Sequence, residues 1–179
     1  MPITLLGSSA FSAQLAGRLG LPFAFAAHFA PEYLSVAAHL YREQFRPSEV
    51  LRTPHLMVAV QVIAAETDAA AQRLFTTPQQ RFLRLIRNQS VELLPPVDSM
   101  EPLWDDWERA AVATKLRAAI LRSDTTVKAG LQKLVGDTGA AEVIVVTDTC
   151  EHADRLKSYQ RVARVAATMK VRPSAAVGV

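Results

Sequence analysis

The sequence of 179 residues contains a single cysteine, Cys150. One cysteine excludes an intramolecular disulfide and agrees with a reducing compartment. No apolar run approaches the roughly 18 residues that a membrane-spanning helix needs. The N-terminus lacks a basic segment, and Gly7 interrupts its apolar stretch, so it does not resemble a signal peptide. We therefore expect a cytoplasmic protein that does not contact a membrane.

A strong charge of one sign is also absent. The net charge is only +3, and Lys and Arg are interspersed with Asp and Glu, which argues against a nucleic-acid partner. The four histidines are not spaced like metal ligands, so no metal site is expected. The sequence contains neither a P-loop nor the Gly-x-Ser-x-Gly elbow of serine hydrolases. These absences remove several enzyme classes.

The sequence does contain an alternation of strand and helix patterns. Half of the residues are hydrophobic, which fits one globular domain over 1–170, and the aperiodic tail 171–179 is expected to be disordered. Helical periodicity follows each strand pattern, which predicts an α/β fold with a parallel sheet and right-handed crossovers. Short apolar runs predict four strands, at 3–6, 23–26, 56–64 and 143–147.

The helices carry their own signals. Phe11, Leu15 and Leu19 recur every four residues, the pattern of an apolar helix face that packs on a core. Pro78 should kink or divide a helix that runs from Thr67 to about Arg87. Residues 88–102 show little periodicity, which predicts an irregular segment. Residues 136–139 are predicted to form a turn. In the final helix, 152–169, the apolar face comprises Leu156, Tyr159, Ala163 and Ala166.

Ligands of parallel α/β folds bind at the carboxyl ends of the strands. This rule selects residues 7–12, 27–29, 64–68 and 147–152. In the first segment, Gly7 permits a tight turn at a helix N-terminus. The hydroxyls of Ser8, Ser9 and Ser12 then predict a phosphate site, because the helix dipole favours an anion there. From spacing alone, an ordinary serine N-cap is an equal alternative.

His28 follows the second predicted strand. Its imidazole could bind a ligand or transfer a proton, or it could simply bond to a neighbouring loop. Asp148 ends the last strand and is expected to cap the final helix. Cys150 has no recognisable activating partner, so a catalytic thiol is not expected.

The segment 5–31, which begins Leu-Leu-Gly-Ser-Ser and ends Ala-His-Phe-Ala-Pro, resembles the bacterial luciferase-like monooxygenases. The similarity continues in order through 41–48, 79–85, 94–98, 145–148 and 152–159. Enzymes of this family are flavin-dependent TIM barrels. The sequence departs from the family pattern at Arg122, where a glycine is usual, and at Cys150, where an aromatic residue is common.

This resemblance implies that the first strand is the fifth of eight and that its turn binds the phosphate of reduced FMN. Gly7, Ser8, Ser9 and Ser12 would then contact the cofactor. His28 would face the flavin pocket as the candidate catalytic residue. A complete barrel needs about 250 residues, so we expect a partial TIM barrel, a half-barrel of strands five to eight with outer helices.

The implied function is that of an oxidoreductase, a monooxygenase that oxygenates a small organic substrate with reduced FMN and dioxygen. A deazaflavin remains an alternative cofactor. In the second interpretation the chain is a non-catalytic half-barrel that binds flavin or phosphate. A half-barrel exposes apolar edges, so we expect a homodimer or pairing with a partner half-barrel. The isolated chain is expected to have little or no activity.

Overall fold

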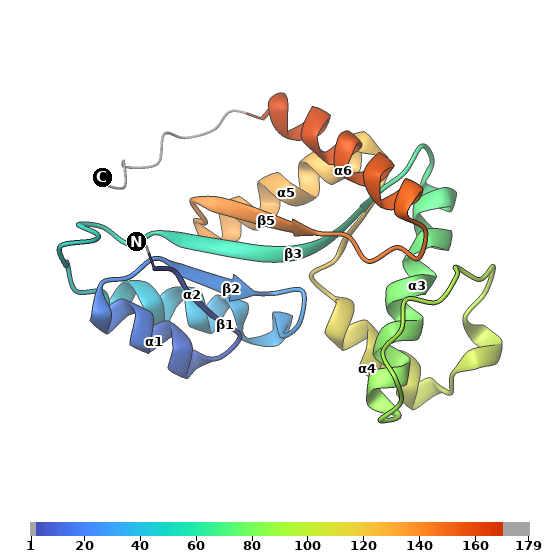
Figure 1. The fold of residues 1–179 in the computed structure, drawn as a ribbon, viewed down its shortest axis with the longest axis horizontal. Helices are drawn as coiled ribbons and strands as arrows, with labels where there is room; N and C mark the ends of the chain where they lie inside the picture. The colour runs from blue at the N-terminus through green and yellow to red at the C-terminus, as the bar shows by residue number, and fades with distance from the viewer. Residues whose placement is uncertain (1–2, 170–179) are drawn as a thin grey trace. The chain divides into compact units, whose positions relative to one another are not determined.

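The computed structural model describes residues 3–169, and the predicted disordered tail, 171–179, lies outside the described residues. Strands and helices alternate along the chain, as the sequence predicts (Figure 1). The strands are β1 (Leu5–Gly7), β2 (Phe23–Ala26), β3 (Leu56–Ala64), β4 (Ile120–Arg122) and β5 (Glu142–Val146). The α-helices are α1 (Ala10–Leu19), α2 (Leu34–Glu43), α3 (Asp68–Ile86), α4 (Asp106–Leu116), α5 (Asp124–Thr138) and α6 (His152–Ala167). Two short 3₁₀ helices are η1 (Pro31–Tyr33) and η2 (Glu101–Leu103).

Strand pairing confirms the predicted parallel α/β fold. β1 pairs in parallel with β2, so that Gly7 lies opposite Phe25. β2 pairs in parallel with the first half of β3, whose second half pairs in parallel with β4. β5 also pairs with β3. The prediction of four strands is wrong by one, because it omits β4. This short strand begins only four residues after the end of helix α4 at Leu116, so its apolar residues merge with the helical pattern.

By its contacts the described chain divides into two compact units. The first unit comprises 3–60 and 132–144, and the second comprises 61–131 and 145–169. In the described part of both units, no helix is long and apolar enough to cross a membrane.

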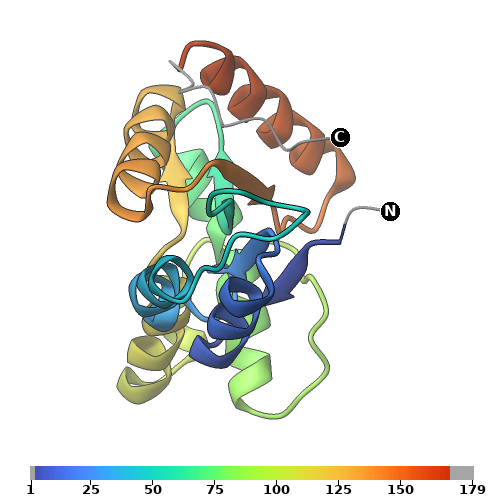
Figure 2. The ribbon, with the colours of Figure 1, turned by 90° about the vertical axis from the view of Figure 1, so that its left-hand side faces the viewer.

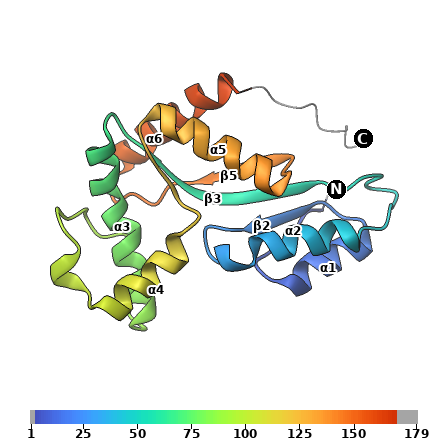
Figure 3. The same ribbon diagram turned by 180° about the vertical axis from the view of Figure 1, so that it is seen from behind.

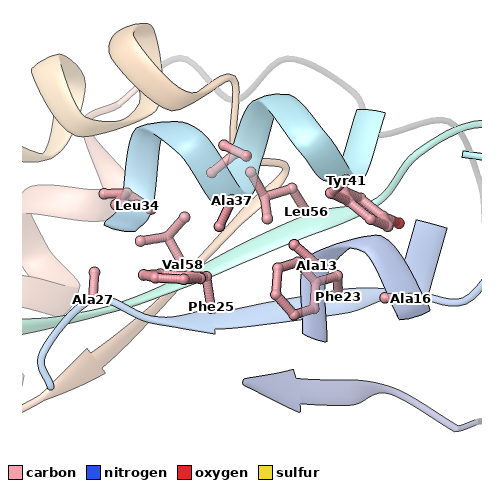
Figure 4. Close-up of a cluster of buried hydrophobic side chains, with 12 residues drawn as sticks. Ala13, Ala16, Phe23, Phe25, Ala27, Leu34, Ala37, Tyr41, Leu56 and Val58 are labelled. Atoms are coloured by element: carbon pink, nitrogen blue, oxygen red, sulfur yellow. The ribbon is translucent and has the colours of Figure 1, made fainter. Parts of the chain in front are cut away.

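The core of the first unit lies between the strands and helices α1 and α2. Phe23 and Phe25 of β2 are fully buried, and their rings meet edge to face with centroids 6.2 Å apart (Figure 4). The Tyr41 hydroxyl donates to the Leu21 carbonyl and accepts from His55 N, and burial raises the pKa of Tyr41. The core comprises Ala13, Ala16, Phe23, Phe25, Ala27, Leu34, Ala37, Ala38, Tyr41, Leu56, Val58 and Ala140.

Helix α1 packs on this core through small residues, not through its predicted apolar stripe. Its buried residues are Ala13, Ala16 and Gly17. A Cβ on Gly17 would lie 2.7 Å from the Tyr41 carbonyl oxygen, so α1 and α2 approach closely there. The two helices lie side by side in Figures 1 and 3, and Figure 2 shows them nearly end-on. The residues expected to pack on the core are exposed: Phe11 73%, Leu15 37% and Leu19 52%.

The second unit is built around the end of β3 and helices α3 and α4. We predicted that Pro78 would kink or divide this helix. Helix α3 is continuous through Pro78, so the proline does not divide it. Residues 88–100 form no helix or strand, as expected. Ile63 of β3 belongs to the core of this unit. The buried core residues are Ile63, Phe75, Phe82, Leu83, Met100, Val112 and Leu116.

Two further predictions fail in detail. Helix α5 runs through Gly136 to Thr138, and the chain turns only at Gly139, whose φ is +59°. The predicted apolar face of α6 is also misplaced, because Leu156 and Tyr159 are exposed. The buried residues of α6 are Ser158, Val162 and Val165, and the Ser158 hydroxyl accepts a hydrogen bond from Ala64 N.

Candidate functional site

The turn between β1 and α1 is held by two serines. Ser9 is the N-cap of α1, and its Oγ accepts a hydrogen bond from Ser12 N. Ser12 Oγ in turn accepts from Ser9 N and donates to the Ser9 carbonyl. This reciprocal capping box uses both hydroxyls to close the first turn of the helix. A Cβ on Gly7 would lie 2.1 Å from Ser12 Oγ, so only glycine fits before this turn.

Other donors of the same turn remain uncommitted. Among the described residues, none accepts a hydrogen bond from Ala10 N or Phe11 N, the first two N–H groups of α1. The Ser8 hydroxyl is half-buried and also has no partner within residues 3–169. These groups lie at the positive end of a ten-residue helix, where an anion is favoured. The four predicted contacts therefore divide into two roles: Ser9, Ser12 and Gly7 shape the turn, while Ser8 is free to contact a ligand.

His28 lies just beyond the adjacent strand, β2. Its backbone N donates to the Ala59 carbonyl, 2.9 Å away. The ring Nδ1 is buried and has no hydrogen-bond partner among the described residues. A buried polar atom without a partner is costly, unless a ligand or water completes it. Because β1 and β2 are parallel, the β1–α1 turn and His28 follow strand ends at the same edge of the sheet.

In the second unit, Asp148 follows β5 but does not cap helix α6. Its carboxylate pairs with the Arg81 guanidinium of α3, and the N-cap position of α6 is Glu151, which makes no side-chain capping bond. The expected helix cap is therefore wrong, because an ion pair with a cation on another helix competes successfully for the carboxylate. The neighbouring Thr147 hydroxyl donates to the Val62 carbonyl. The Cys150 thiol donates to the adjacent Glu151 carboxylate, with Sγ 4.0 Å from Oε1.

Gln61 is a residue that the sequence reasoning missed. It lies in β3, is only 3% exposed, and its Nε2 has no partner within the described residues. The available signal was its position as the single polar residue in a nine-residue apolar strand.

The second unit also has an open cleft of about 480 Å³, between α3 and residues 98–104. Arg73 and Asp98, which line it, are already paired with each other at 2.8 Å. Within residues 3–169, no group of three or more His, Cys, Asp or Glu side chains could hold a metal ion.

Known proteins resemble this chain in sequence and in fold. Residues 1–164 match the family model of the luciferase-like monooxygenases. The uncharacterized protein YvbT of Bacillus subtilis (strain 168) is 49% identical over 165 residues, which cover 92% of this chain and 49% of YvbT. Among solved structures, apo-MsnO8 is 30% identical with a TM-score of 0.75, and the match covers 97% of this chain and 52% of MsnO8.

A more distant structure shares the fold at 17% identity and a TM-score of 0.58, over 97% of this chain and 50% of the other. It is the oxygenating constituent of 3,6-diketocamphane monooxygenase from Pseudomonas putida, in complex with FMN. The chain thus spans about half the length of the curated relatives that it matches. It belongs to the luciferase-like monooxygenase family.

Proposed function

We propose that this chain binds the phosphate of a flavin at the β1–α1 turn and serves a monooxygenase that oxygenates a small organic substrate. The observation that carries the proposal is the pair of uncommitted N–H groups, Ala10 N and Phe11 N, at the start of α1. A phosphate dianion suits this position, since the aligned peptide dipoles and two free donors favour negative charge.

The residues present fit reduced FMN. Ala10 N, Phe11 N and the Ser8 hydroxyl would hold its phosphate, and the absence of a side chain on Gly7 keeps the turn closed. His28 Nδ1, buried without a described partner, would hydrogen-bond to the ligand from the end of β2. When bound, the reduced flavin supplies the electrons that activate dioxygen, while the protein binds, orients and excludes water. FMN is favoured by the diketocamphane monooxygenase structure that contains it, and a deazaflavin is the alternative.

Ser9→Asp tests the phosphate site without removing the helix cap, because Asp caps a helix as well as Ser does. The added negative charge should weaken FMN binding at least about tenfold. Riboflavin, which has no phosphate, should lose little affinity. The matched control is Thr67→Asp at the N-cap of α3, where the Thr67 hydroxyl accepts from Ala70 N. If FMN and riboflavin bind equally in the unchanged protein, the turn is only a helix cap.

A second candidate function is favoured by the exposed apolar side chains of α1 and by the half-length match to the relatives. In this proposal the chain is a half of a TIM barrel, with β1, β2, β3 and β5 in the places of strands five to eight, and binds flavin or phosphate without turnover. It would dimerise or pair with a partner half-barrel. Oxygenated product formed by the isolated chain with reduced FMN would exclude this second candidate.

A further inference from the structure

Helix α1 presents an apolar stripe that nothing in the first unit covers. Phe11, Leu15 and Leu19 recur every four residues and are 73%, 37% and 52% exposed. At 100° per residue, Phe11 and Leu15 project opposite to the packed face of Ala13, Ala16 and Gly17. Three large apolar side chains aligned on one exposed helix face are more typical of an interaction surface than of a surface that faces only solvent.

The strand beneath this helix has one unpaired edge. β1 pairs with β2 alone among the described strands, and Leu5 N donates to the Pro22 carbonyl on that side. Peptide groups alternate in direction along a strand, so Leu6 directs its N–H and carbonyl to the opposite, unpaired edge. The Leu6 side chain is also 67% exposed. An open strand edge with an apolar flank invites a further strand.

We propose that the α1 stripe (Phe11, Leu15, Leu19) and the free edge of β1 form one docking face for a strand-and-helix segment. The occupant is a polypeptide of the kind that makes up the half of the relatives that this chain does not match. YvbT and MsnO8 each contain about as much chain again outside the match, so in both proteins a polypeptide of that size accompanies the matched half. The inference rests on the proposed half-barrel.

The observed strand pairs favour this occupant over a second copy of the chain. Every strand pair with a described register is parallel. A twofold axis between two copies would set β1 against β1 antiparallel, over only three residues. A parallel strand followed by a helix instead repeats the β1–α1 arrangement, because right-handed crossovers put successive helices on the same face. Its helix would then pack on Phe11, Leu15 and Leu19.

The test is co-expression of this chain with a separate, tagged polypeptide that comprises the part of YvbT outside the match. The unchanged chain should co-purify with it as a one-to-one complex in size-exclusion chromatography with light scattering. F11D and L15D should each lower the affinity at least about tenfold. Neither side chain belongs to the buried core, so both variants should keep the helical circular dichroism of the parent.

Trp107→Asp is the matched control. Trp107 is 68% exposed and is the second residue of α4, as Phe11 is of α1, and both helices begin with a capping box. W107D should bind the YvbT segment within about twofold of the parent. Absence of a complex, equal effects of F11D and W107D, or self-association that F11D abolishes would each overturn the proposal. The assay needs no flavin, so a complex that fails to hold FMN would refute the proposed function but not the docking face.

Discussion

His55 Nε2 lies 2.8 Å from Oε1 of Glu142, so the residue before β3 is joined to the first residue of β5. The His55 side chain is 6% exposed, whereas the Glu142 side chain is 56% exposed. Loss of this hydrogen bond should destabilise the protein mainly through the buried imidazole, because a buried nitrogen without a partner is not compensated for its desolvation.

We expect His55→Ala to lower the free energy of unfolding by about 2 kcal/mol, from lost packing and a lost hydrogen bond. Glu142→Gln keeps an acceptor oxygen near Nε2 and should cost less than about 1 kcal/mol, as exposed ion pairs do. Urea titrations of the two variants measure the difference. Equal losses would mean that the ion pair, and not the buried ring, provides the stability.

Replacing two helical glycines by alanine should change the stability of the protein in opposite directions. A Cβ on Gly17 would meet the Tyr41 carbonyl at 2.7 Å, whereas a Cβ on Gly136 would meet nothing within 4 Å. Gly17→Ala should therefore destabilise by about 1–3 kcal/mol, because α1 must move away from α2. Gly136→Ala should stabilise by about 0.5–1 kcal/mol through helix propensity. Thermal melts of both variants test the close approach, which shifts of the same sign would contradict.

Some sequence signals were sufficient to predict the fold, and others were not. Alternating strand and helix patterns were sufficient to predict the parallel fold. The prediction that Phe11, Leu15 and Leu19 pack on the core was wrong, because helical periodicity identifies an apolar face but not the part of the protein that covers it. Small residues decided the packing of α1 instead, a feature visible only once Gly17 is seen against Tyr41.

The sequence predicted where the residues of the candidate site lie better than it predicted what each of them does. Sequence spacing put Ser8, Ser9 and Ser12 at a helix start but could not distinguish capping hydroxyls from free ones. That distinction needs the hydrogen bonds between Ser9 and Ser12. Asp148 was misjudged because its partner, Arg81, is 67 residues away in sequence.

Asp68 should make stability depend on acid pH. Its Oδ1 accepts a hydrogen bond from Ser123 N at 2.9 Å, and this bond lowers the pKa of Asp68 from its ordinary value of 3.8. The unfolded chain then binds the proton more tightly than the folded chain. The stabilisation is therefore fully present above about pH 5 and is lost as the pH falls through the lowered pKa.

Asp68→Asn keeps an acceptor oxygen but cannot ionise. We expect the unfolding free energies of D68N and the parent to differ most near neutral pH and to converge as the pH falls below the ordinary Asp value. Denaturant midpoints measured from pH 7 down to the acid limit of folding give this comparison. A difference that stays constant across the range would show that the ionised carboxylate contributes nothing.

The isolated chain should show little or no monooxygenase turnover. Oxygenation requires the reacting groups in near-attack positions and a cavity that excludes water. This chain spans about half the length of the curated relatives that it matches. The assay follows oxygenated product from long-chain aldehydes or alkanes with reduced FMN, since free reduced flavin consumes oxygen by itself. His28→Ala is the informative variant, and His39→Ala, which changes an exposed histidine of α2, is its control. The expectation would be contradicted if the isolated chain formed product and if H28A, but not H39A, abolished it. That result would show that this chain by itself contains a complete active site.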